Sequence, residues 1–168
     1  GHSLLELDLV RCTVSQQLDL KQYEKLQKIR LESTRDVYLS SPSTSILDFS
    51  YWGGNRIGLE AVLRMCPMLE DLCIENIDYT FKTLDLSAFK SLKRLDVRHC
   101  PHLESMSVNN LAKMTVVDCA TLSSILVDAN GRGHQQGIIE AQDGEIHVSV
   151  LGGEIDITHC PLVKITFQ

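Results

Sequence analysis

Six cysteines and six histidines are the residues of this 168-residue chain with the chemistry to bind a metal ion. Zinc sites bring such side chains together on one ion. His99 precedes Cys100 and His159 precedes Cys160, but neighbouring residues on a strand point to opposite faces. The chain has no Cys-x-x-Cys pair. We therefore expect no metal site and no other cofactor.

The serine, histidine and acidic residues give little support for catalysis. Serine and histidine occur without a nucleophile-elbow motif, and the paired glycines at 53–54 and 152–153 indicate turns rather than phosphate loops. We expect no enzymatic activity in this chain, with any activity in another domain of the parent protein. Because acidic residues cleave sugars in other solenoids, the alternative function is a carbohydrate-active or carbohydrate-binding β-helix.

Charged side chains recur at the middle position of a Leu-x-Leu pattern. Alternation along a strand sends the two apolar residues inward and the middle residue outward. The middle residues would therefore form a column on one face of a sheet. In chain order they are Asp8, Arg30, Asp48, Cys73, Asp96, Thr115, Glu140 and Asp156.

This column and its neighbours form a predicted contact face for another protein. Patterned charge steers partners together and adds specificity. The alternative is that these charges only keep exposed strands in solution. Tyr51 beside the column is a candidate aromatic anchor. The predicted contact residues are Asp8, Arg30, Asp48, Tyr51, Arg94, Asp96, Arg98, Lys113 and Asp156.

The elements that position these residues come from an internal repeat. Copies of the frame L-x-x-L-x-L-x-x-C recur along the chain, some of them with substitutions in single slots. They occupy residues 4–12, 26–34, 47–52, 69–77, 92–100, 111–119 and 152–160. One apolar row cannot be buried by a single coil, so successive coils must stack.

A second series of apolar pairs lies between these copies, as in Met106-x-Val108 and Ile125-x-Val127. We expect a mainly β solenoid of about eight short coils, with strands on two sides and little helix. The helix is predicted near residues 57–66, from the spacing of its apolar residues, with Asn55 as a possible N-cap and Pro67 at its end. Residues 128–137 are predicted to bulge as a loop, after which Ile138 or Ile139 restarts the strand series.

The stretches LEDLCI, LKRLDVRHC and LAKMTVVDC carry the consensus L-x-x-L-x-L-x-x-[N/C], and the chain from Leu4 to Phe167 resembles a leucine-rich-repeat protein. Cysteine in the last slot resembles the cysteine-containing subclass that is common in F-box-type adaptors. The short repeats also resemble those of bacterial effectors. The resemblance implies a right-handed solenoid that serves as an adaptor, an effector or the substrate-recognition part of a ubiquitin ligase.

The last slot of the frame predicts a buried ladder of small residues. Cys12, Cys100, Cys119 and Cys160 share this slot, so we expect free structural thiols there. Cys66 and Cys73 are predicted to fill core positions. Trp52 is predicted to take the place of a ladder cysteine and to be buried.

The composition limits which classes of partner and which cellular compartment we expect. The net charge of -6 argues against nucleic-acid binding, and no apolar run reaches the length of a membrane span. We interpret residues 1–3 as a cloning remnant and residues 4–168 as one solenoid domain, a fragment of a larger protein. We expect a monomer that binds another protein in the cytoplasm, or in a host cytoplasm if it is a secreted effector. A self-assembling structural solenoid is a third possibility.

Overall fold

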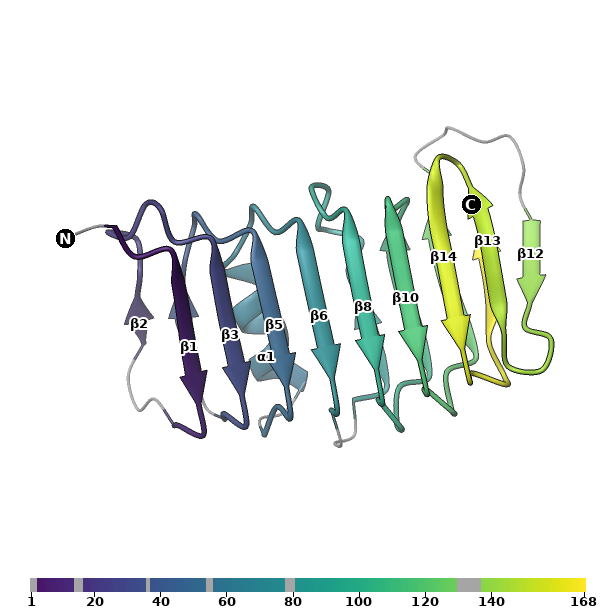
Figure 1. Cartoon of the computed structure of the whole chain (residues 1–168), viewed down its shortest axis with the longest axis horizontal. Helices are drawn as coiled ribbons and strands as arrows, with labels where there is room; N and C mark the ends of the chain where they lie inside the picture. The colour runs from purple at the N-terminus through teal and green to yellow at the C-terminus, as the bar shows by residue number, and fades with distance from the viewer. Residues whose placement is uncertain (1–2, 14–16, 36, 54–55, 78–80, 130–136) are drawn as a thin grey trace.

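The computed structural model describes residues 3–13, 17–35, 37–53, 56–77, 81–129 and 137–168. Strands account for 48% of the chain, which forms a β-solenoid of stacked coils with one short helix (Figure 1). The mainly β class with little helix is therefore confirmed. No helix among these residues has the length and apolar character needed to cross a membrane.

The main sheet holds eight strands, in the order β1-β3-β5-β6-β8-β10-β14-β13. Seven of them run parallel and in phase, so each Leu-x-Leu pair lies beside the pair of the next coil. The eighth strand, β13 (Ile146–Val150), is antiparallel to β14. The parallel strands are β1 (Glu6–Val10), β3 (Lys28–Glu32), β5 (Ile46–Ser50), β6 (Asp71–Glu75), β8 (Arg94–Arg98), β10 (Lys113–Val117) and β14 (Gly153–Thr158).

The opposite side of the solenoid carries the second strand series. Strands β2 (Leu18–Asp19) and β4 (Leu39–Ser40) pair with each other. A separate sheet has the order β12-β15-β11-β9-β7, and in it only β12 is antiparallel. Its strands are β7 (Thr83–Asp85), β9 (Ser105–Asn109), β11 (Ser124–Asp128), β12 (Gly137–Glu140) and β15 (Lys164–Phe167).

Helix α1 (Arg56–Arg64) takes the place of a second-series strand in the coil between β5 and β6, and Figure 1 shows it behind the main sheet. The predicted helix is confirmed, with slightly different ends. Leu59, Val62 and Leu63 lie on one helical face and are buried in the core. The proposed N-cap, Asn55, lies outside the described residues.

The C-terminal end departs from the repeat. Strand β12 joins the second sheet rather than the main sheet, so the prediction of Glu140 in the outward column is wrong. The position beside Asp156 belongs to His147 of β13. The solenoid has about five turns, so the expected eight coils are not confirmed. Most of the predicted loop, residues 130–136, lies outside the described residues.

Each parallel strand of the main sheet ends in the same bend. The residue after the strand has φ between 50° and 56°, a region that L-residues seldom adopt. From Arg11 to Asp118, the N–H of this residue donates to a carbonyl of the next strand at 2.8–3.0 Å, which offsets the strain. The bend residues are Arg11, Ser33, Tyr51, Asn76, His99, Asp118 and His159.

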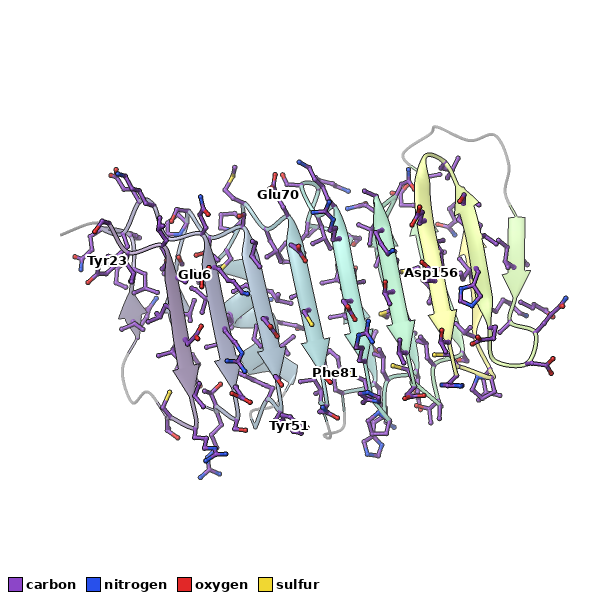
Figure 2. The ribbon with its side chains drawn as sticks, in the orientation of Figure 1. Glu6, Tyr23, Tyr51, Glu70, Phe81 and Asp156 are labelled. Carbon is purple, nitrogen blue, oxygen red and sulfur yellow. The ribbon has the colours of Figure 1, made fainter. Side chains whose placement is uncertain are left out.

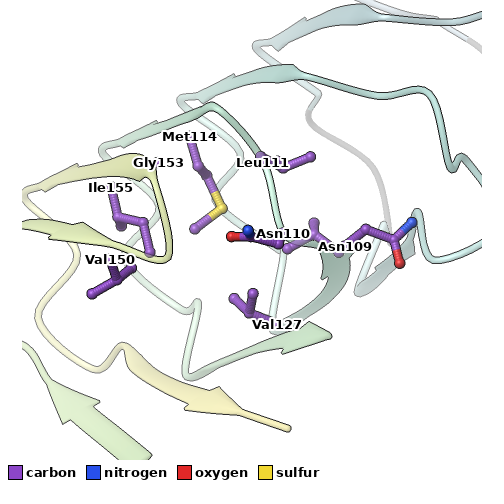
Figure 3. Close-up of a pocket in the computed structure, with 9 residues that line it drawn as sticks. Asn109, Asn110, Leu111, Met114, Val127, Val150, Gly153 and Ile155 are labelled. Carbon is purple, nitrogen blue, oxygen red and sulfur yellow. The ribbon is translucent and has the colours of Figure 1, made fainter. Parts of the chain in front are cut away.

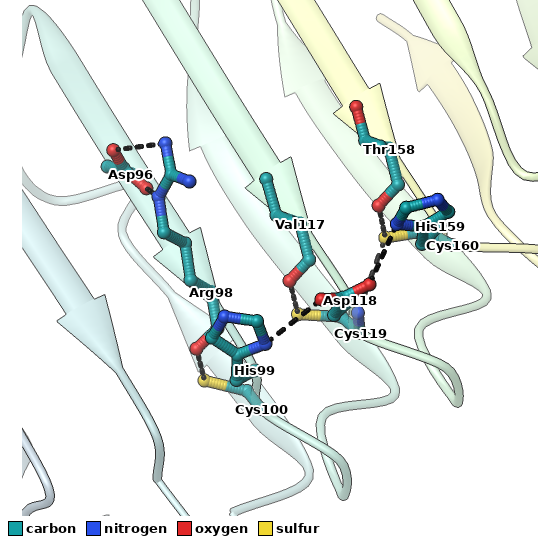
Figure 4. A network of polar contacts seen from close by, with 10 residues as sticks. All are labelled: Asp96, Arg98, His99, Cys100, Val117, Asp118, Cys119, Thr158, His159 and Cys160. Carbon is teal, nitrogen blue, oxygen red and sulfur yellow. Dashed lines mark hydrogen bonds and ion pairs between the residues drawn. The ribbon is translucent and has the colours of Figure 1, made fainter.

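After the bend the chain turns inward into the predicted ladder. Cys100, Cys119 and Cys160 are buried, and each thiol donates to the carbonyl oxygen two residues earlier, at 3.4–3.6 Å (Figure 4). A small side chain with a weak donor suits this slot. All six cysteines are free thiols.

Trp52, Cys66 and Cys73 test the three other predictions about buried positions, and Cys66 is buried as predicted. Trp52 is only 2% exposed and packs edge-on against Phe49, with ring centroids 5.5 Å apart, so its predicted burial is confirmed. The core position predicted for Cys73 is wrong. Cys73 is the middle residue of β6, and its side chain therefore points outward.

Inward side chains of the parallel strands carry the stability of the fold. Leu95 is 1% exposed at the centre of the main sheet, and its neighbours in register are Leu72 and Met114. We expect Leu95→Ala to lower the free energy of unfolding by about 2–5 kcal/mol. The removed methyl groups lose their contacts, and the cavity left behind destabilises the fold further. Urea unfolding measures this. Arg94→Ala, on the exposed neighbour, should stay within about 0.5 kcal/mol of wild type.

The thiols should differ in reactivity. Under denaturing, non-reducing conditions all six should react with a thiol reagent. In the native protein only the half-buried Cys12 and Cys73 should be accessible to the reagent. Cys73 should react more slowly than an ordinary exposed thiol, because burial and nearby acids raise its pKa to about 12. Early labelling of Cys100 or Cys119 in the folded protein would contradict the buried ladder.

Candidate functional site

The outward side of the main sheet, called the main face below, brings the predicted contact residues together. Except for Tyr51, all of them occupy outward strand positions. Figure 2 shows Glu6 and Asp156 near opposite ends of this face. Its middle row is Asp8, Arg30, Asp48, Cys73, Asp96, Thr115, Asp156 and His147.

Tyr51 lies at the margin of the main face rather than on it. It is the bend residue after β5, with φ at 54°, and its side chain is 55% exposed. The side chain is therefore largely exposed at the end of the strands, and Figure 2 shows it at the lower edge of the sheet. Tyr51 is thus exposed, as an aromatic anchor would have to be.

Local pairing shapes the electrostatics of the main face. Arg98 donates to both carboxylate oxygens of Asp96, at 2.7 and 3.3 Å. Arg30 lies 3.0 Å from Glu32 and 3.9 Å from Asp8. These exposed pairs contribute little to stability, but they hold long side chains in fixed positions.

A second set of charged residues on the main face makes no close ion pair within the described part of the chain. Within the described part of the chain, Lys28, Asp48, Asp71, Glu75 and Arg94 make no ion pair within 4.0 Å. Burial raises the pKa of Asp71, an effect that the charge of Arg94 partly offsets. These five residues lie on strands β3 to β8, so the centre of the face keeps charges that a partner could neutralise.

Cys73 lies among these central charges, and its surroundings argue against thiol chemistry. Burial, together with Asp48, Asp96 and Glu75, raises its pKa to about 12. The nucleophilic form of cysteine is the thiolate, which is scarce at neutral pH under these conditions. Cys73 is therefore a neutral side chain at the centre of the face.

The C-terminal part of the main face carries a linked polar network. His147 lies 3.0 Å from Asp156 through Nδ1 and 3.4 Å from Glu145 through Nε2. Hydrogen bonding to Asp156, then to Glu145, raises the pKa of His147. Lys113 lies 3.6 Å from Asp156 and 3.4 Å from Glu154.

Sequence reasoning missed His147 as a member of the main face. A predicted parallel coil has no place for it beside Asp156, whereas an antiparallel hairpin does. The available signal was a Leu-Gly dipeptide at 151–152 between two alternating segments, Ile146-x-Val148 and Ile155-x-Ile157.

The bends below the main face add a further cluster, shown in Figure 4. Asp118 lies between two histidines, 3.1 Å from Nδ1 of His99 and 3.0 Å from Nδ1 of His159. Within the described residues, no three side chains of His, Cys, Asp or Glu are arranged to hold one metal ion. This cluster joins three consecutive coils through side-chain contacts at hydrogen-bonding distance.

The core cavity in Figure 3 lies away from the main face. It measures about 10 Å³ and is lined by Met114, Val150 and Ile155 among others, too small for a ligand. Gly153 borders it, and the Cβ of an alanine there would overlap the carbonyl oxygen of Leu111. The cavity therefore reflects the close approach of two coils rather than a binding site.

Comparison with known proteins does not place the chain in a family. No protein-family model, no curated protein and no solved structure matches it.

The His147–Asp156 contact predicts a pH dependence of stability. The folded pKa of His147 is raised above 6.5, so its contribution is fully present below that pH and is lost as the pH rises through the folded pKa. His147→Gln should therefore lower the free energy of unfolding at pH 6 more than at pH 8, as measured by urea unfolding.

The partner residue supplies the control. Hydrogen bonding to His147 lowers the pKa of Asp156, so this carboxylate stabilises the fold above its ordinary pKa and loses that effect as the pH falls. In an Asp156→Asn background, the pH-dependent effect of His147→Gln should shrink. An equal effect in both backgrounds would show that the contact does not cause it.

Proposed function

We propose that this chain is a non-catalytic protein-recognition module that binds its partner through the main face. The observation that carries the proposal is a continuous charged surface across parallel strands held in register. Parallel sheets are usually covered on both sides, whereas the outward residues here are exposed or half-buried. A broad, bare and rigid sheet suits recognition of another protein.

The division of charges supports a particular mode of contact. Asp96 with Arg98, and Arg30 with Glu32, are already paired and serve as fixed surface features. The five residues without a close ion pair, Lys28, Asp48, Asp71, Glu75 and Arg94, are the ones best able to pair with opposite charges on a partner. Such contacts increase the association rate and suppress wrong partners.

The proposal includes the finer features that the sequence resemblance implies. These are a leucine-rich-repeat affiliation, a right-handed winding and a role as adaptor, effector or ubiquitin-ligase recognition part in a cytoplasm. The phased Leu-x-Leu strands and the cysteine ladder support this affiliation.

Charge reversal on the main face tests the proposal. The immobilised chain is used to capture proteins from a cell lysate, and each captured protein is purified for kinetic measurement. We expect Arg94→Glu with Lys113→Glu to slow association with the true partner by about tenfold at low salt and to flatten its salt dependence. Unfolding in urea should change little, because both residues are exposed.

The matched control is Lys82→Glu with Lys164→Glu, which changes the charge equally on the second side of the solenoid. Asp19 and Asp85 are less suitable controls, because each accepts a hydrogen bond from a backbone N–H two residues later. If the control pair slows association while the main-face pair binds as wild type, the contact surface lies elsewhere and the proposal fails.

A further inference from the structure

The C-terminal end of the solenoid is formed by internal residues rather than by the last ones. Strand β13 pairs only with β14 and forms the edge of the main sheet, while β12 pairs only with β15 at the edge of the second sheet. The last strand, β15, lies between β12 and β11. Within the described residues, this end therefore presents two strand edges that have no paired strand.

Geometry fixes which backbone groups of β13 face outward. The turn after β13 has positive φ at both Leu151 and Gly152, as in a two-residue hairpin closed by Val150 and Gly153. The N–H and C=O groups of Ile146, Val148 and Val150 are then directed at β14. Those of His147 and Ser149 are directed at the free edge, because the groups alternate along a strand.

Within the described residues, the β13 edge has none of the usual protection against pairing. Natural edge strands carry proline, an inward-pointing charge or a bulge. Here the inward residues are Ile146, Val148 and Val150, and the last two are only half-buried. Ile155 and Ile157 of β14, which lie opposite Val148 and Ile146, are nearly inaccessible to solvent.

An apolar groove opens between the two edges. Its volume is about 410 Å³, and its lining includes Ile139, Val150, Leu151 and Phe167. Ile138 at its rim is 62% exposed, the most exposed large apolar side chain among the described residues. Apolar side chains at this end are thus only partly covered by the described residues.

We propose that this end binds a second copy of the chain, with β13 pairing antiparallel to β13 of the other copy about a two-fold axis. Placing Val148 on the axis sets His147 opposite Ser149 of the second copy, in the hydrogen-bonded positions. Val148 then faces Val148 across the close, non-hydrogen-bonded position. No like charges face each other, so the edge is complementary to itself.

The other end of the main sheet is a poorer surface for self-pairing. The outward residues of β1 include Glu6 and Asp8, so two antiparallel β1 strands would set carboxylates against carboxylates. Like charges on opposed strands are destabilising. The two ends therefore differ, and only the C-terminal edge suits a closed, symmetric dimer.

The dimer would join the main faces of two copies into one surface. A two-fold axis perpendicular to the sheet keeps both main faces on the same side. The contact itself uses only the edge and the groove, so it is independent of the recognition function proposed above. It replaces the monomer expected from the sequence, in which β13 was not recognisable as an antiparallel edge.

Sedimentation and light scattering of the purified chain test the proposal. We expect a concentration-dependent mass that stops at twice 18.8 kDa. Val148→Lys places a charge inside the edge, and Ser149→Pro removes a free-edge N–H. Each should raise the dissociation constant by at least about tenfold. The matched variants Leu9→Lys and Val10→Pro, on β1, should leave the dimer intact.

A crosslinking experiment reads the register directly and does not depend on weakening the dimer. Val148→Cys lies opposite itself in the proposed pair, with Cβ atoms about 5 Å apart. A short bis-maleimide should therefore convert this variant, and not Val10→Cys, into a covalent dimer. Native Cys12 and Cys73 are half-buried in both variants and provide the same background.

Four results would overturn the proposal. These are a monomer at all concentrations up to about 0.1 mM, a dimer unaffected by either β13 variant, a dimer lost only in the β1 variants, or growth beyond two copies. Circular dichroism establishes whether each variant is folded. If Val148→Lys does not fold, the crosslinking yield of Val148→Cys decides the question.

Discussion

The structure depends on burying one apolar row against the next. A single coil supplies two inward residues per strand, such as Leu95 and Val97, and cannot cover them alone. Stacking in register places Leu72 and Met114 on either side of Leu95, so that all are almost completely buried. Because the side-chain period of a strand is two, this register also sends every intervening residue outward. The charged main face is thus a consequence of how the core is built.

The register is held at the lower edge of the sheet by a repeated bend. A left-handed residue costs about 1–2 kcal/mol where it is not glycine. Yet Ser33, Tyr51, Asn76 and His99 all adopt it, and each N–H continues the ladder of hydrogen bonds into the next coil. The ladder residue that follows points inward, and a cysteine there also bonds the strand's last carbonyl. The slot requires an inward-pointing side chain that the core can cover, and residues as different as Trp52 and Cys100 meet this requirement.

Much of this arrangement could be predicted from spacing alone. The frame L-x-x-L-x-L-x-x-C located the parallel main strands, the ladder and the outward column, including the burial of Trp52. Strand direction could not be predicted, because Ile146-x-Val148 alternates in the same way in a parallel or an antiparallel strand. Direction is decided by the two-residue turn at 151–152, whose positive φ values reverse the chain. Because strand direction could not be predicted, Glu140 was wrongly placed in the outward column and His147 was not recognised beside Asp156. Cys73 was predicted both for the outward column and for the core, and only the column position is correct, because its neighbours Leu72 and Ile74 fill the core.

His147 connects the two surfaces. Its side chain lies on the main face against Asp156, while its backbone groups belong to the free edge of β13. The contact of the imidazole with Asp156 adds a side-chain link to the backbone pairing of β13 with β14. Lys113 lies 3.6 Å from the same carboxylate. His147 is therefore the one residue of the middle row that belongs both to the main face and to the proposed dimer edge.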